Sequence, residues 1–67
     1  MSTQRLKIVL ARLRESKGLT KRELARRAKV TEAYVSQLES GARRNPSLPV
    51  LKRLAKALGV PVTELLP

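Results

Sequence analysis

The ionisable side chains of this sequence are better suited to binding anions than to catalysis. Its 67 residues include 15 Lys and Arg, five Glu, no His and no Cys, for a net charge of +10. The usual general base, the soft nucleophile and most transition-metal ligands are therefore missing. No glycine-rich phosphate loop is present either, because the three glycines stand alone. We expect no enzyme, no metal site and no cofactor.

The excess positive charge predicts a polyanionic partner, with nucleic acid ahead of an anionic membrane surface. Residues 1–29 carry ten basic and two acidic side chains, a net charge of +8. Residues 30–47 are neutral overall, and residues 48–67 carry +2. Solubility alone does not require such a pattern. The pattern indicates a basic surface beside a neutral segment that has another purpose.

The length predicts one small domain over residues 1–67, with a thin core and no disulfide to support it. No apolar run reaches the roughly 18 residues of a membrane span. No charged-then-apolar secretory leader is present. We therefore expect a cytoplasmic protein without a membrane segment.

Apolar residues recur at helical spacing along the chain, so the expected fold class is all-α. The spacing that starts at Leu6 predicts an amphipathic helix over about residues 4–17. Thr20 and Glu23 have the spacing of a capping box, in which each side chain accepts from a free backbone N–H of the other residue. This box predicts the start of a short helix over about residues 21–28.

The same signals continue in the second half of the chain. Thr31 predicts the start of a third helix over about residues 32–40. Ser47 is placed to cap a fourth helix, and Gly59 to end it. Residues 60–66 predict one last short helical turn. The chain is thus expected to form five helices.

The helices over residues 21–28 and 32–40, joined by a three-residue turn, have the helix-turn-helix arrangement. In that arrangement one helix braces against the phosphate backbone while the next lies in the major groove. Val35 and Leu38 mark the buried side of the second helix. The opposite side carries only small or amide side chains, at Ala33, Ser36, Gln37 and Ser40. Such a face can approach base edges closely.

From Leu19 to Leu66 the chain resembles the phage-repressor/Cro type of helix-turn-helix proteins, the XRE family. The matching segments are Leu19 to Ala25, Val30-Thr31, Val35 to Gly41, Arg44 to Leu48 and Leu54 to Val60. Each segment is weak alone, but together, in order and at the family's spacing, they are specific. The resemblance implies a five-helix lambda-repressor-like domain that binds specific DNA sequences, usually as a dimer on palindromic sites.

Carried over by position, the resemblance also implies roles for individual residues. It implies a phosphate contact by Lys21, base contacts by Glu32, Ala33 and Gln37 with Tyr34 and Ser36 beside them, and backbone contacts by Arg43, Arg44 and Asn45. It further implies a structural pair between Arg14 and Glu39. Two positions depart from the family pattern: Lys29 replaces the usual turn glycine, and Pro61 replaces the usual Ser or Thr cap of the last helix.

Several of these residues have a second interpretation. Gln37 is the best candidate base reader, because its amide can bond both N6 and N7 of adenine, although it could simply be hydrated. Ala33 could contact a thymine methyl group or merely favour the helix. Glu32 could accept from cytosine N4 or stabilise the N-terminal end of its helix. Arg43 and Arg44 could contact phosphates or form a solvated pair in the loop.

The expected function is a transcriptional regulator, a repressor that acts as a dimer on double-stranded DNA. The candidate dimer residues, which could instead close the core, are Ile8, Val60, Val62, Leu65 and Leu66. The alternative is an antitoxin or adaptor-type interaction module of the same fold, with a partner protein such as a toxin. A membrane-surface peptide is disfavoured, because the caps and hydrophobic staples describe a compact fold.

Overall fold

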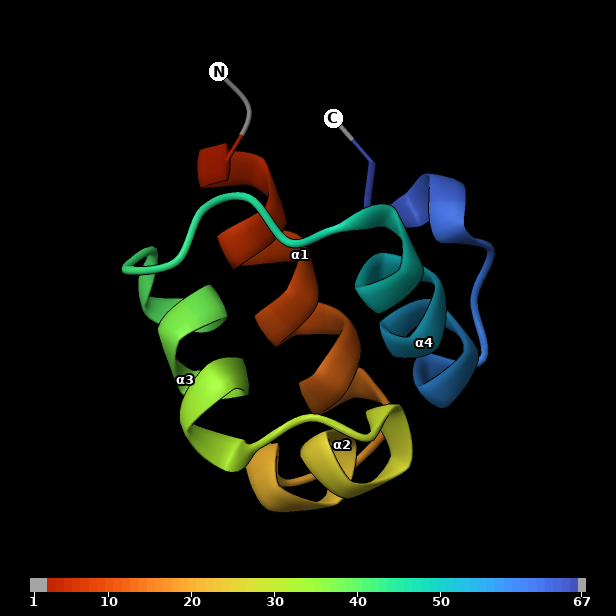
Figure 1. Ribbon diagram of the computed structural model, residues 1–67. Helices are drawn as coiled ribbons and strands as arrows, with labels where there is room; N and C mark the ends of the chain where they lie inside the picture. The colour runs from red at the N-terminus through yellow and green to blue at the C-terminus, as the bar shows by residue number, and fades with distance from the viewer. Residues whose placement is uncertain (1–2, 67) are drawn as a thin grey trace.

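The computed structural model describes residues 3–66, with side chains from Arg5 onward, as four α-helices and one 3-10 turn. The elements are α1 (Thr3–Ser16), α2 (Lys21–Ala28), α3 (Glu32–Ser40), α4 (Leu48–Leu58) and η1 (Val62–Glu64). In Figure 1, α2 crosses below α1, while α3 and α4 stand on opposite sides of it. The all-α class is therefore confirmed. None of the described helices is long and apolar enough to cross a membrane.

Three helices begin where the sequence predicts a side-chain cap. At α2, Thr20 Oγ1 accepts from the Glu23 backbone N–H at 3.0 Å, and Glu23 Oε1 accepts from the Thr20 N–H at 2.8 Å. Thr31 and Ser47 cap α3 and α4 through their hydroxyl oxygens. Because a cap satisfies N–H groups that have no partner within the helix, these local signals fix the start of each helix.

The turn between α2 and α3 depends on a left-handed residue that is not glycine. Lys29 has φ 61° and ψ 43°, a conformation that costs an L-residue with a Cβ about 1 kcal/mol relative to glycine. Its N–H donates to Arg26 O at 3.3 Å, and the Val30 N–H donates to Ala25 O at 3.0 Å. These bonds end α2 and turn the chain at once into α3.

The predicted fifth α-helix is wrong. Its segment forms a single 3-10 turn, Val62–Glu64, preceded by Pro61, which makes no side-chain cap bond. The Leu65 N–H donates to Val62 O at 2.9 Å, so the segment closes with i to i+3 bonds. A proline has no side-chain oxygen to satisfy the free N–H groups that a Ser or Thr cap would satisfy. No α-helix therefore begins after Pro61 in the described part of the chain.

The core consists of aliphatic side chains from all four helices and the segment after η1. Its largest fully enclosed members are Leu10, Leu24, Leu38, Leu54, Leu65 and Val35. Ala25 and Ala28 are buried in α2, which packs on both α3 and α4; their small side chains allow this close approach. Leu65 thus closes the core and is not available as a dimer contact, whereas Ile8 remains 46% exposed.

Candidate nucleic-acid interface

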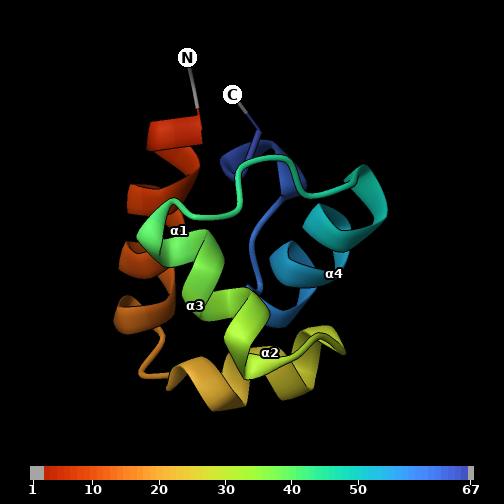
Figure 2. The same cartoon turned by 60° about the vertical axis from the view of Figure 1, so that its left-hand side comes forward.

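The outer side of α3 is open, as its helical spacing predicts. Figure 2 shows α3 in front of the other helices. Ala33 and Gln37 are exposed and Ser36 is half-buried, while Val35 and Leu38 are 0% and 1% exposed. The buried pair fixes which side of α3 faces the core. Ala33, Ser36 and Gln37 on the outer side are short or amide side chains without charge.

Arg43 folds back onto this outer side of α3. Its guanidinium carbon lies 4.9 Å from the centroid of the Tyr34 ring, and its Nε donates to Gln37 Oε1 at 3.1 Å. The Arg43 backbone N–H also donates to Gln37 O at 3.1 Å. The sequence predicted a backbone contact beyond the helix for Arg43, and did not predict its attachment to Gln37 and Tyr34.

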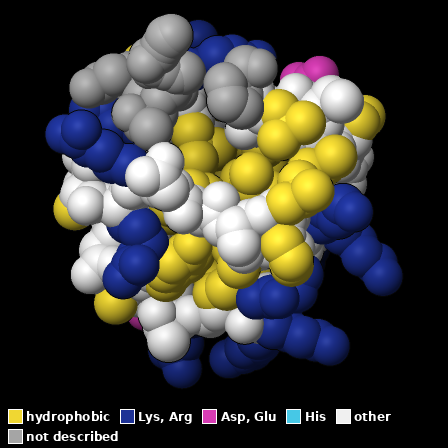
Figure 3. Space-filling model, turned by 45° about the horizontal axis from the view of Figure 1, so that its top comes forward, with side chains coloured by type: hydrophobic (Ala, Val, Ile, Leu, Met, Phe, Trp, Pro, Cys, Tyr) yellow, Lys and Arg dark blue, Asp and Glu magenta, His cyan; other side chains and the backbone are white. Residues whose placement is uncertain are grey.

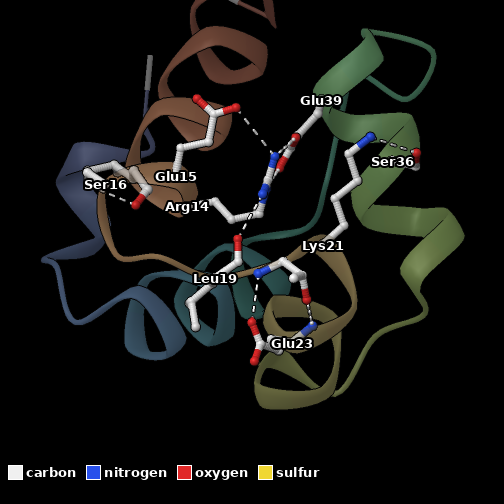
Figure 4. A network of polar contacts seen from close by, with 10 residues as sticks. Arg14, Glu15, Ser16, Leu19, Lys21, Glu23, Ser36 and Glu39 are labelled. Atoms are coloured by element: carbon white, nitrogen blue, oxygen red, sulfur yellow. Dashed lines mark hydrogen bonds and ion pairs between the residues drawn. The ribbon is translucent and has the colours of Figure 1, made fainter.

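Lys21, the first residue of α2, reaches across to α3. Its Nζ donates to Ser36 Oγ at 3.4 Å, as Figure 4 shows. The side chain is half-buried, so one of its three donors is directed to Ser36 and the ammonium lies at the edge of the outer side of α3. The N-terminal end of α2 favours anions because its backbone dipoles point positive ends outward.

The remaining predicted contact residues lie around α3. Glu32 is exposed in its first turn. Arg44 and Asn45 are exposed in the loop that follows α3. Together with Gln37, Ala42 and Arg43 they line a shallow open hollow of about 560 Å³. Of the nine predicted residues, the structure thus brings Gln37, Arg43, Arg44 and Asn45 together around this hollow, with Tyr34 beneath Arg43 and Lys21 in contact with Ser36.

The inner flank of α3 is held by an ion pair. Arg14 donates from Nε to Glu39 Oε2 at 2.6 Å and from Nη2 to Oε1 at 3.0 Å. Its Nη1 donates to Leu19 O at 2.8 Å. One guanidinium therefore links three parts of the chain, which are α1, α3 and the loop that precedes α2 (Figure 4). The two side chains are only 12% and 7% exposed. Hydrogen bonding to Glu39 raises the pKa of Arg14, so the guanidinium stays charged.

A second basic region lies away from this side. Arg27, Lys29, Arg53 and Lys56 line a hollow of about 370 Å³ at the ends of α2 and α4. Arg53 Nε donates to Ala28 O at 3.0 Å, which is a helix C-terminal contact of the kind that favours cations. In Figure 1 these helix ends are on the right, and α3 is on the left. Sequence reasoning missed this hollow because its residues come from two helices far apart in the chain.

Two short helices joined by a tight turn, the second with an open uncharged side, define a helix-turn-helix. The comparison with family models agrees: the model described as "Helix-turn-helix" matches residues 10–65. The chain belongs to this family, of the XRE type, and carries the DNA-binding domain of a transcriptional regulator.

Named relatives and solved structures are similar to the chain over most of its length. The HTH-type transcriptional regulator y4dJ of Sinorhizobium fredii is 51% identical over 82% of this chain and 70% of its own. SinR of Bacillus subtilis is 38% identical over 79% of this chain, which spans 48% of SinR. The restriction-modification controller protein C.AhdI of Aeromonas hydrophila is 34% identical with a TM-score of 0.89, over 96% of each chain. The clp gene regulator ClgR of C. glutamicum is also 34% identical, with a TM-score of 0.86 over 97% of this chain and 83% of its own.

Proposed function

We propose that the protein is a repressor of transcription that binds a palindromic operator as a dimer, with α3 in the major groove. The observation that carries the proposal is the open, uncharged outer stripe of α3 flanked by cations. The major groove is about 12 Å wide and admits a helix. Short side chains on α3 allow close approach to base edges, and Lys21, Arg44 and Asn45 are placed to contact the phosphates on either side.

The proposal of a dimer rests on the size of the domain. Its longest dimension is 28 Å, whereas successive major grooves on one side of DNA lie about 34 Å apart. One copy therefore reads one groove, and two copies are needed for two half-sites. Exposed Ile8 and Leu48, with half-buried Val62 and Leu66, are candidate contacts between copies. Figure 3 shows hydrophobic side chains gathered on the face that includes η1 and the start of α4.

Repression follows from occupation of the operator, because a protein seated in the groove blocks other proteins from the same base pairs. The test is a selection of bound sequences from random duplex DNA. We expect an enriched palindrome whose half-site centres lie about 10–10.5 bp apart, or a multiple of that distance. A reporter gene placed behind this operator should be transcribed less when the protein is present. Recovery of no enriched sequence would refute specific reading.

Two variants separate reading from attachment. Gln37→Ala should flatten the preference at one or two base positions. Arg44→Ala should weaken binding to all sequences alike and reduce the slope of log affinity against log salt by about 1. Equal effects of the two variants on sequence preference would contradict the assignment of these residues.

The basic hollow at the ends of α2 and α4 favours a second candidate, an antitoxin or adaptor-type module. Its four cations lie away from α3, so an acidic segment of a partner such as a toxin could bind there while α3 occupies DNA. Co-purification with the product of an adjoining gene tests this candidate. The double variant Arg27→Glu/Lys56→Glu should abolish co-purification and preserve the operator preference, whereas unchanged co-purification would contradict it.

A further inference from the structure

The pairing of Arg43 with Gln37 bears on which base is read. We infer that the two side chains form one reading unit for guanine, in which Arg43 decides the preference of Gln37. This inference rests on the proposed function, because it assumes that α3 lies in the major groove. It assigns Arg43 to base recognition, and not to the DNA backbone.

The first step is the chemistry of the contact between the two side chains. Arginine has donors and no acceptor. The amide group that lies 3.1 Å from Arg43 Nε must therefore present its oxygen to it, as the structure shows. The oxygen of Gln37 is thus engaged by Arg43, and the Nε2 amino group, a donor, is left for an external partner.

The second step is the fixed position of Arg43. Its guanidinium lies over the Tyr34 ring at 4.9 Å, and its backbone N–H is bonded to Gln37 O. Both contacts hold the arginine against α3 and reduce the conformational freedom that binding would otherwise cost. No hydrogen bond or ion pair involves Arg43 Nη1 or Nη2 within the described residues, so this end of the guanidinium is available to bond a ligand.

The third step matches these donors to a base. The groups of the unit that have no partner within the described residues are the donors Gln37 Nε2 and the two Nη groups of Arg43, while the acceptor Gln37 Oε1 already accepts one hydrogen bond. In the major groove, guanine presents two acceptors, N7 and O6, whereas adenine presents an acceptor beside the N6 donor. To bond both atoms of adenine, Gln37 Oε1 would have to accept from N6 on its second lone pair while it still accepts from Arg43 Nε, and adenine N7 would be the one acceptor left for all the donors of the unit. The pairing therefore favours guanine and disfavours adenine.

The experiment compares the wild type with Arg43→Ala and the matched control Arg44→Ala. Within the described residues, Arg44 makes no hydrogen bond with Gln37 and no cation–π contact with Tyr34. Each protein is titrated with the selected operator and with every single base-pair variant of it, at fixed salt. For the wild type we expect guanine to be preferred by about 5- to 150-fold at the base pair that Gln37 and Arg43 contact. In Arg43→Ala the freed amide oxygen should shift the preference at that position toward adenine. Arg44→Ala should lower every affinity by a similar factor and keep the preference for guanine.

A double-mutant cycle with Gln37→Ala keeps the test decisive if Arg43→Ala binds weakly. Residues that act as one unit give non-additive effects, so the double variant should lose little more discrimination than either single variant. Helical circular dichroism checks that each variant is folded.

The outcomes separate the two proposals. If Arg43→Ala weakens all sequences equally, as Arg44→Ala does, Arg43 contacts phosphate and the inference is overturned while specific reading by α3 stands. Additive effects in the cycle would also overturn it. If the wild type itself shows no preference among base pairs, the proposed function fails.

Discussion

Two arginines contact α3 from opposite sides. Both donate through Nε, but their acceptors and their exposure to solvent differ. Arg14 Nε donates to a carboxylate oxygen of Glu39 at 2.6 Å on the inner flank, where the side chains are 12% and 7% exposed. Arg43 Nε donates to the neutral amide of Gln37 at 3.1 Å on the open outer side. The enclosed arginine has its donors engaged inside the protein. The exposed one keeps the end of its guanidinium for a ligand.

The surroundings decide what each contact contributes to stability. A charge that is enclosed and loses its partner is strongly destabilising, because water cannot replace the partner. An exposed hydrogen bond is readily exchanged for one to water, so its net contribution is small. The comparison therefore predicts that the same substitution, arginine to alanine, has very different effects at the two positions.

The largest effect is expected for Arg14→Ala. It leaves the Glu39 carboxylate enclosed without its cation, which costs about 3–5 kcal/mol for a buried pair. In a domain this small, such a loss unfolds much of the population at ordinary temperature. Urea denaturation followed by far-ultraviolet circular dichroism measures it. A loss below about 1 kcal/mol would place this pair in the class of surface ion pairs.

The control removes both charges together. Arg14→Met with Glu39→Leu leaves no unpaired ion and fills similar volume, and such replacements are often neutral or stabilising. The double variant should therefore be more stable than Arg14→Ala in the same denaturation experiment. Equal stability of the two would show that the cost comes from lost packing, and not from the unpaired carboxylate.

A substitution in the turn between α2 and α3 should change the free energy of unfolding by an amount between the effects of the two arginine variants. Lys29→Gly relieves the left-handed strain at φ 61° and should raise the free energy of unfolding by up to about 1 kcal/mol, less the extra entropy of glycine in the unfolded chain. The matched control is Lys56→Gly inside α4, which should instead lower it by about 1 kcal/mol. A lower free energy of unfolding for Lys29→Gly in urea denaturation would contradict the claim that Lys29 is strained.

Arg43→Ala should change the free energy of unfolding by less than about 0.5 kcal/mol, as most surface substitutions do. We expect this substitution to change the binding of DNA and not the stability of the free protein. The same urea titration measures the stability, beside the Arg14→Ala sample. A loss above roughly 1.5 kcal/mol would erase the contrast and assign Arg43 a structural role like that of Arg14.

The smallest effect concerns a third polar contact that pH can weaken. The Thr20 backbone N–H, followed by the Thr20 side chain, lowers the pKa of Glu23 from its usual 4.5. A carboxyl whose folded pKa is depressed adds stability above its unfolded pKa, and this contribution is lost as pH falls through the folded pKa. Glu23→Gln keeps an acceptor for the capping box but does not titrate. The difference in stability between wild type and variant should therefore shrink from pH 7 to pH 3 in urea titrations, and a constant difference would contradict the role of the charge.

The helix bounds could be predicted closely because their signals are local. Residues 21–28 and 32–40 are helical as expected, since Thr20, Glu23 and Thr31 act within one turn of each start. The last segment was predicted as a helix from its apolar residues, and Pro61 without a cap prevented it. Local pattern cannot weigh those two signals against each other.

The site could be predicted as a surface but not as a set of contacts. Spacing placed Ala33 and Gln37 outside and Val35 inside, because a helix fixes these directions. The direction of Arg43 could not be read from spacing, since it lies in a loop and its side chain has several rotatable bonds. Contact with DNA by the nine residues remains a prediction.

The absence of Trp and Phe and the single Tyr in the sequence have a practical consequence. Nearly all near-ultraviolet absorption and emission of the chain comes from one phenol, Tyr34, at the rim of the proposed interface and beneath a guanidinium. The aliphatic core is optically silent in that range. Unlabelled protein should therefore signal ligand arrival at this rim through its own tyrosine emission, while melting of the interior has to be followed through the peptide bonds.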